Sequence, residues 1–174
     1  GNLLREVEIC KKNIYIMKKL TTFLLTCALC IGIADAQVVK EIGDGTGTNT
    51  NTPFVNGADE TMSQTLYLAE EIGFGSGSTI SAISYNCASV GAYLEDENVK
   101  IYMVNSDLTS LTRAGSNTLP ESQMTLVYHN TSYRQPDATG WFTITLDSPF
   151  TYNGGSLIVV VKRSGVHTGG NTYM

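Results

Sequence analysis

The alternation of apolar and polar residues along the chain predicts a series of short β-strands. Thr79–Cys87, Val99–Val104 and Trp141–Leu146 alternate with a period of two residues, which is typical of half-buried strands. Ser156–Lys162 is a continuous apolar run rich in β-branched residues, so we expect a central strand covered on both faces. Further strands are expected at Val38–Ile42, Gln64–Leu68, Thr125–His129 and Pro149–Tyr152. Ala69–Gly73 is expected to form either one helical turn or a plain turn that stops at Gly73.

These elements predict an all-β fold. About seven or eight short strands separated by turn signals, with no long helix, indicate a two-sheet antiparallel β-sandwich of the jelly-roll or immunoglobulin type. The connection from Ser106 to Gln123 is long for a hairpin. We therefore expect it to cross between the sheets and favour a jelly-roll-like fold. Trp141 is expected to pack in the core at the start of its strand.

The N-terminal region has the pattern of a secretory signal peptide. Two lysines, Lys18 and Lys19, precede the apolar stretch Leu20–Ile33, and the small-x-small sequence Ala34-Asp35-Ala36 stands before Gln37. We expect this helical leader to be cleaved between Ala36 and Gln37. The alternative of a membrane span is less favoured because the apolar run is shorter than the ~20 residues that a span needs.

This leader divides the chain into three parts. Residues 1–16 lie upstream of Met17 and are expected to be a non-native extension. Residues 17–36 are the predicted signal peptide, and residues 37–174 are the predicted sandwich domain. Because a jelly roll needs a partner for its first strand, we expect the C-terminal edge of the domain, and further domains, to continue beyond Met174.

Charge and composition narrow the class of protein. The chain has a net charge of −5 and only 16% charged residues, with many Ser, Thr, Gly and Tyr residues in place of charges. Such a composition is typical of extracellular all-β domains, and the acidic balance argues against a nucleic-acid partner. Cys87 is the single cysteine after the leader, so it forms no internal disulfide and is expected to be a buried thiol.

Two acidic segments are candidate cation sites. Asp44 and Asn49, in a glycine-rich loop, supply oxygen ligands that suit calcium. The alternative is a plain flexible connection, and a phosphate-binding loop is excluded because no Gly-Lys-Ser/Thr ending or helix follows. The cluster Glu95-Asp96-Glu97 is a second candidate, with a solvated hairpin tip as the alternative. Apart from calcium, no cofactor is expected.

No catalytic residue is assigned from the sequence. Only two histidines are present, His129 and His167, and no segment resembles a nucleophile elbow. Together with Cys87 they are the only candidate nitrogen and sulfur ligands for zinc, and their spacing does not indicate a site.

Aromatic residues are candidates for ligand binding. One hypothesis is a sugar-binding platform, because aromatic faces stack on sugar rings; its residues would be Tyr93, Tyr128 and Tyr133, with Trp141 and Tyr152. The alternative is that these tyrosines pack in the core with a solvated hydroxyl.

Five segments together resemble a known kind of module. They are Met62–Gly73, Gly77–Tyr85, Lys100–Met103, Gly140-Trp141 and Leu146–Tyr152. Their order is similar to a β-sandwich module of secreted and surface proteins of Bacteroidetes, where it accompanies gingipain-type peptidases, fibronectin type III domains and type IX secretion sorting tails. The matched residues are mostly structural.

The resemblance implies a non-catalytic adhesion or binding module, an accessory unit of a larger secreted or cell-surface protein, with a glycan or a host protein as ligand. One alternative is the N-terminal module of a secreted hydrolase whose catalytic domain lies beyond Met174. Another alternative is a structural spacer without a ligand.

Overall fold

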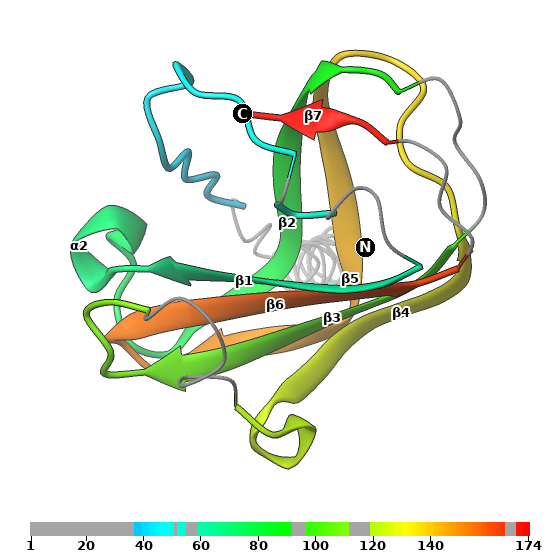
Figure 1. Ribbon diagram of the computed structural model, residues 1–174. Helices are drawn as coiled ribbons and strands as arrows, with labels where there is room; N and C mark the ends of the chain where they lie inside the picture. Colours follow the sequence, from blue (N-terminus) through cyan, green and yellow to red (C-terminus); the bar gives the residue numbers. More distant parts are fainter. Residues whose placement is uncertain (1–36, 51, 55–58, 92–96, 112–118, 166–169) are drawn as a thin grey trace, which may run out of the picture. The chain divides into compact units, whose positions relative to one another are not determined.

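Two antiparallel sheets form the described part of Lys40–Met174 (Figure 1). The computed structural model describes residues 37–50, 52–54, 59–91, 97–111, 119–165 and 170–174. The strands are β1 (Glu60–Tyr67), β2 (Ser78–Ser89), β3 (Glu97–Ser106), β4 (Thr125–Tyr133), β5 (Gly140–Tyr152), β6 (Ser156–Ser164) and β7 (Thr172–Tyr173). The helices are α2 (Ala69–Ile72) and the 3₁₀ turn η1 (Glu121–Gln123).

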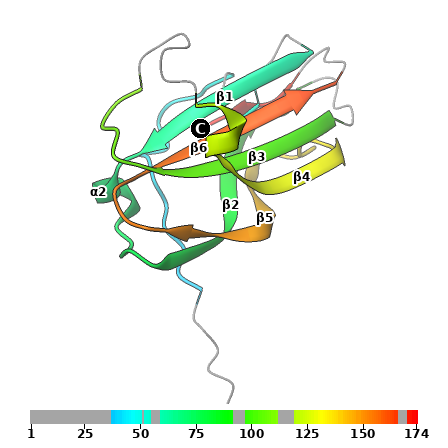
Figure 2. The same ribbon diagram turned by 90° about the horizontal axis from the view of Figure 1, so that it is seen from below.

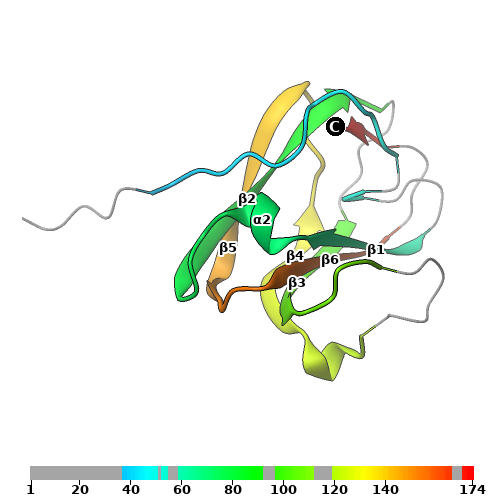
Figure 3. The same ribbon diagram turned by 90° about the vertical axis from the view of Figure 1, so that its left-hand side faces the viewer.

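The predicted β-sandwich is confirmed. One sheet has the strand order β1-β6-β3-β4 and the other has the order β5-β2-β7, and the strands of the two sheets cross at a steep angle (Figures 1 and 3). The chain changes sheet after β1, β2, β4, β5 and β6, and the first strand lies beside the last long one. The strand expected at Val38–Ile42 is wrong, because these residues are not part of either sheet.

Strand β6 is the central strand that its apolar run predicts. It pairs with β1 on one side and with β3 on the other, and Leu157, Val159 and Val161 point into the sandwich. On the opposite face, Ile158 and Val160 are also buried. Both faces of β6 are therefore covered, unlike those of an edge strand.

The segment between β3 and β4 provides the cover on the outer face. Its residues Leu111, Leu119 and Met124 pack on a small apolar cluster of Tyr102, Ile158 and Val160. Strands β3 and β4 are neighbours in one sheet, so the expectation that Ser106–Gln123 crosses between sheets is wrong. The described residues of this connection thus cover apolar side chains on the outer face.

The main core lies between the sheets. From β3, Ile101 and Met103 are fully buried, as their alternation predicts. Phe54 comes from outside the strands and is also fully buried, with its ring 5.2 Å from that of Tyr133 and 5.8 Å from that of Tyr173. Such separations are typical of favourable aromatic pairs.

Two of the irregularities in strand pairing redirect side chains. In the first, Ile101 of β3 pairs with Tyr128 of β4, whereas the next residue, Tyr102, pairs with Leu126. Val127 is therefore an extra residue in β4. In the other sheet, Ile80 pairs with Phe150 whereas Ala82 pairs with Thr145. The sequence Leu146-Asp147-Ser148-Pro149 therefore bulges out of β5, which is a position where a strand tolerates proline.

The second bulge also changes which residues of β2 face the core. The alternation in Thr79–Cys87 places Ile80 on the opposite face from Ile83 and Tyr85. In the structure all three pack against the main core. The extra β5 residues opposite Ser81 shift the pairing, so strict alternation holds only on each side of the bulge.

A buried polar network ties the short strand β7 to the loops around it. Asn171 is fully buried; its Oδ1 accepts from the Gly91 amide at 2.8 Å and its Nδ2 donates to the Pro136 carbonyl at 2.7 Å. The Tyr173 hydroxyl donates to Oε1 of buried Gln135 at 2.7 Å. Buried polar atoms that are satisfied in this way fix one arrangement of the chain.

The core makes a direct stability prediction. Ile101→Ala removes a fully buried side chain from β3, and we expect the free energy of unfolding to fall by about 2–5 kcal/mol. Leu126→Ala, on the adjacent strand with its side chain 45% exposed, should change it by less than about 1 kcal/mol. Urea unfolding of the full chain measures both values. Equal losses in the two variants would contradict the assigned core.

Candidate ligand-binding site

A hollow of about 310 Å³ lies where the chain leaves β4 and enters β5. We call it the β4–β5 hollow. These two strands are the edge strands of different sheets, and Figure 2 shows them side by side. The lining residues are Tyr128, Tyr133, Arg134, Pro136, Phe142, Thr143, Ile144 and Thr145. The hollow thus combines aromatic rings with hydroxyl groups and one guanidinium.

A hydrogen bond joins the two edge strands beside this hollow. The backbone amide of His129 in β4 donates to Oδ2 of Asp147 in β5 at 2.7 Å. Asp147 reaches β4 because it lies in the bulged Leu146–Pro149 segment. The aspartate therefore supplies an acceptor for a backbone amide of this edge strand.

The structure brings together two of the three tyrosines that the sequence indicates. Tyr128 and Tyr133 have ring centroids 6.3 Å apart in an edge-to-face arrangement. Tyr133 is 8% exposed, whereas Tyr128 is half-buried and its hydroxyl accepts from Nδ2 of Asn130 at 3.2 Å. The bulge at Val127 directs Tyr128 toward the hollow. Tyr93 lies outside the described residues.

Six lining residues were not among the sequence candidates, and three of these six have polar side chains. Thr143 and Thr145 occupy the outward positions of β5, and Arg134 is exposed in the following connection between the edge strands. In the described part of the chain Arg134 forms no salt bridge. The sequence does indicate that Thr143 and Thr145 form a polar face opposite Phe142 and Ile144. It does not show that this face lies beside β4.

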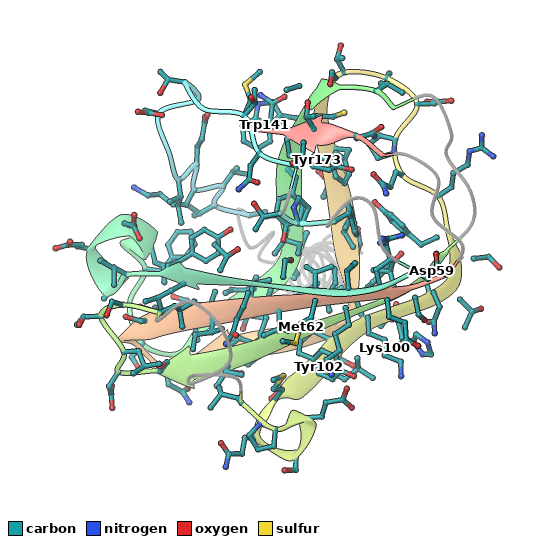
Figure 4. All side chains as sticks on the ribbon, viewed as in Figure 1. Asp59, Met62, Lys100, Tyr102, Trp141 and Tyr173 are labelled. Atoms are coloured by element: carbon teal, nitrogen blue, oxygen red, sulfur yellow. The ribbon has the colours of Figure 1, made fainter. Side chains whose placement is uncertain are left out.

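Trp141 is on the surface, so the expectation that it packs in the core is wrong. It is 57% exposed and occupies the outward position of β5 immediately before Thr143 (Figure 4). Phe142, Ile144 and Leu146 occupy the inward positions of β5. Because side chains alternate along a strand, Trp141 lies on the opposite, outward face. In the sheet Trp141 pairs with Asn86, which gives the ring a polar neighbour.

Tyr152 does not contribute to an exposed aromatic surface. Its side chain is 1% exposed in the main core, and its hydroxyl donates to the carbonyl of Gly155. The aromatic residues proposed from the sequence as a sugar platform therefore lie partly in the core and partly on the surface.

The candidate calcium loop uses its carboxylate locally. Oδ1 of Asp44 accepts from the amide of Thr46 at 3.1 Å and from its hydroxyl at 2.8 Å. These hydrogen bonds lower the pKa of Asp44. The backbone of Asn49 forms a bridge with Tyr173. Within the described ranges no three His, Cys, Asp or Glu side chains gather as a metal-binding group. Asp96 and Glu95 lie outside those ranges, as does the Glu97 side chain.

Cys87 and His129 are on different faces of the fold. Cys87 is 1% exposed in the main core, where burial raises the pKa of its thiol and the thiol donates to the carbonyl of Ser89. His129 is on the outer face, where Nε2 donates to Oδ1 of Asn98 at 2.9 Å. The structure does not bring these two candidate ligands together. His167 lies outside the described residues.

Burial of Cys87 predicts a slow thiol reaction. In a chain with Cys10, Cys27 and Cys30 replaced by serine, we expect Cys87 to react with a thiol reagent only as fast as the sandwich opens. Val90→Cys in the same background with Cys87→Ser should react at once, because Val90 is 38% exposed. A spectrophotometric thiol assay with and without denaturant measures both rates. Immediate labelling of native Cys87 would contradict the assigned burial.

The link between the edge strands predicts a change in amide exchange. Asp147→Ala removes the acceptor of the His129 amide, and we expect hydrogen exchange at that amide to become at least about fivefold faster, equivalent to about 1 kcal/mol of lost protection. Asp137→Ala, which changes an exposed aspartate between β4 and β5, is the matched control. NMR exchange measurements on the full chain test this. Unchanged exchange in Asp147→Ala would show that the bond does not hold the strands.

Comparison of the chain with protein-family models, with curated proteins and with solved structures finds no match. Among the described helices none is both long enough and apolar enough to cross a membrane. The resemblance to the Bacteroidetes modules therefore stays a prediction from the motifs.

Proposed function

We propose that this chain is a non-catalytic binding module of a secreted or cell-surface protein and that it binds a glycan at the β4–β5 hollow. The single observation that carries the proposal is the combination of aromatic rings, hydroxyl groups and Arg134 in one surface hollow. Exposed Trp141 is outside the lining but lies two residues before Thr143 on the same face of β5. The signal-peptide pattern of residues 17–36 supports a location outside the cell.

The chemistry of the hollow suits a sugar. A sugar ring has apolar faces that pack on aromatic rings and hydroxyl groups that need hydrogen-bond partners. Trp141 offers an exposed ring, and Thr143 and Thr145 offer hydroxyl groups along the same face of β5. The guanidinium of Arg134 adds several donors in a planar arrangement. A few placed polar groups among apolar surfaces are typical of small-ligand sites.

The scaffold also supports recognition without large rearrangement. Tyr133 is held against Phe54 in the core, and the Asp147–His129 hydrogen bond fixes the two edge strands that form the walls. A preformed hollow loses less conformational entropy when a ligand binds. Exposed Trp141 is the part that is free to adjust its ring to the ligand.

A glycan array probed with the full chain tests the proposal. We expect binding to a subset of glycans, and Trp141→Ala and Arg134→Gln should each weaken it about tenfold, equivalent to about 1.4 kcal/mol. Both side chains are exposed, so the fold should survive either change. Titration of the best glycan by calorimetry gives the affinities.

Leu126→Ala is the control for this experiment, because it removes an exposed apolar side chain from the other face of β4. Its affinity should equal that of the unchanged chain. Folded chain that binds no glycan would overturn the proposal and favour the structural spacer. Unaltered binding by both Trp141→Ala and Arg134→Gln would place the glycan elsewhere.

A further inference from the structure

A second hollow lies on the outer face of the four-stranded sheet, on the side away from the main core. Its volume is about 370 Å³. We call it the lysine hollow, and its lining residues are Glu60, Thr61, Met62, Asn98, Lys100, Glu121, Lys162, Arg163 and Ser164. It shares no lining residue with the β4–β5 hollow.

Two lysines stand directly opposite each other in this hollow. Strand register places Met62, Lys162, Lys100 and His129 in one row across β1, β6, β3 and β4. Figure 4 shows Met62, Tyr102 and Lys100 together on this side of the sheet. Like charges directly across a strand pair repel each other, so a nearby anion stabilises the arrangement.

One carboxylate faces both lysines. Glu121, from η1, forms a salt bridge with Lys162, whose Nζ also lies 5.8 Å from the centre of the Tyr102 ring. The hydrogen bond and charge of Lys162, with a smaller effect of the Lys100 charge, lower the pKa of Glu121. Lys100 forms no salt bridge with any residue that the structure describes. Its ammonium group is therefore available to a second anion.

The other residues that line the lysine hollow suit a sugar that carries an anionic group. Met62 is 39% exposed and offers an apolar contact. Asn98 is oriented by two hydrogen bonds, accepting from His129 and donating from Nδ2 to Ser164 Oγ at 3.3 Å. Glu60 lies two residues before Met62 in β1. Arg163 is 2% exposed, and its Nε donates a hydrogen bond to the Thr61 hydroxyl.

Charge elsewhere in the chain limits the ligand. Three cationic side chains line the hollow against two carboxylates, whereas the whole chain has a net charge of −5. An extended polyanion or an anionic membrane would be repelled by the rest of such a surface. A ligand with one anionic group on a neutral carrier avoids this repulsion.

We propose that the lysine hollow binds the oxyanion of an acidic sugar, held by Lys100 and Lys162 in competition with Glu121. The site is independent of glycan binding at the β4–β5 hollow.

The methyl group of Met62 reports directly on this site. In the full chain labelled with ¹³C-methyl methionine, we expect glucose 6-sulfate to shift the Met62 signal in a saturable way. The fully buried methyl group of Met103 is the internal control and should not shift. Glucuronic acid distinguishes a carboxylate from a sulfate as the preferred oxyanion. Glucose should leave the Met62 signal unchanged.

Substitutions separate the proposed roles. Lys100→Gln should weaken binding of glucose 6-sulfate about three- to fivefold, whereas Glu121→Gln should tighten it by a similar factor because the competing carboxylate is removed. Lys40→Gln, which removes an exposed lysine outside the hollow, should leave the affinity unchanged. Trp141→Ala should also leave it unchanged, so failure of the β4–β5 proposal does not affect this readout.

Three results would overturn the proposal. The first is the absence of any Met62 shift with either acidic sugar in both the unchanged chain and Glu121→Gln. The second is a Lys100→Gln variant that binds as tightly as the unchanged chain. The third is inorganic sulfate binding as tightly as glucose 6-sulfate, which would show that the hollow does not contact the sugar.

Discussion

The fold depends on burying both faces of β6. Its side chains alternate between the main core, where Val159 and Val161 pack, and the outer face, where Ile158 and Val160 pack. A sandwich normally leaves its outer faces to solvent, so this strand imposes a second requirement. Leu111, Leu119 and Met124, between β3 and β4, meet it by packing on this face. The connection between these two strands also contains Glu121, which forms a salt bridge with Lys162. The segment that covers the apolar residues of β6 therefore also places a carboxylate beside the lysine hollow.

Much of this architecture could be predicted from local patterns. The run Ser156–Lys162 predicts a central strand because only full burial suits so many consecutive apolar residues. The helical turn before Gly73 also agrees with the structure, in which Gly73 ends α2 with φ of 67°. By contrast, Val38–Ile42 has a strand-like pattern but no neighbouring strand, because pairing depends on distant parts of the chain.

The candidate binding site was less predictable. Tyr128 and Tyr133 are recognisable from their residue type, but only the fold shows that β5 lies beside β4. Nothing in the sequence around Arg134 indicates that it lines a binding site. For Trp141, residue type and alternation conflict: a tryptophan favours burial, whereas the position belongs to the polar face of β5. Alternation determined its position, since the inward positions of that strand are occupied by Phe142, Ile144 and Leu146.

The pairing of β1 with β6 also has a consequence for how the chain folds. Glu60 pairs with Ser164, so the first strand must wait until almost all the intervening chain is in place. Such distant pairings carry a large loop-closure cost before any contact compensates for it, and they slow folding. Strand β1 therefore stays without its only partner strand in the four-stranded sheet until β6 has emerged from the ribosome.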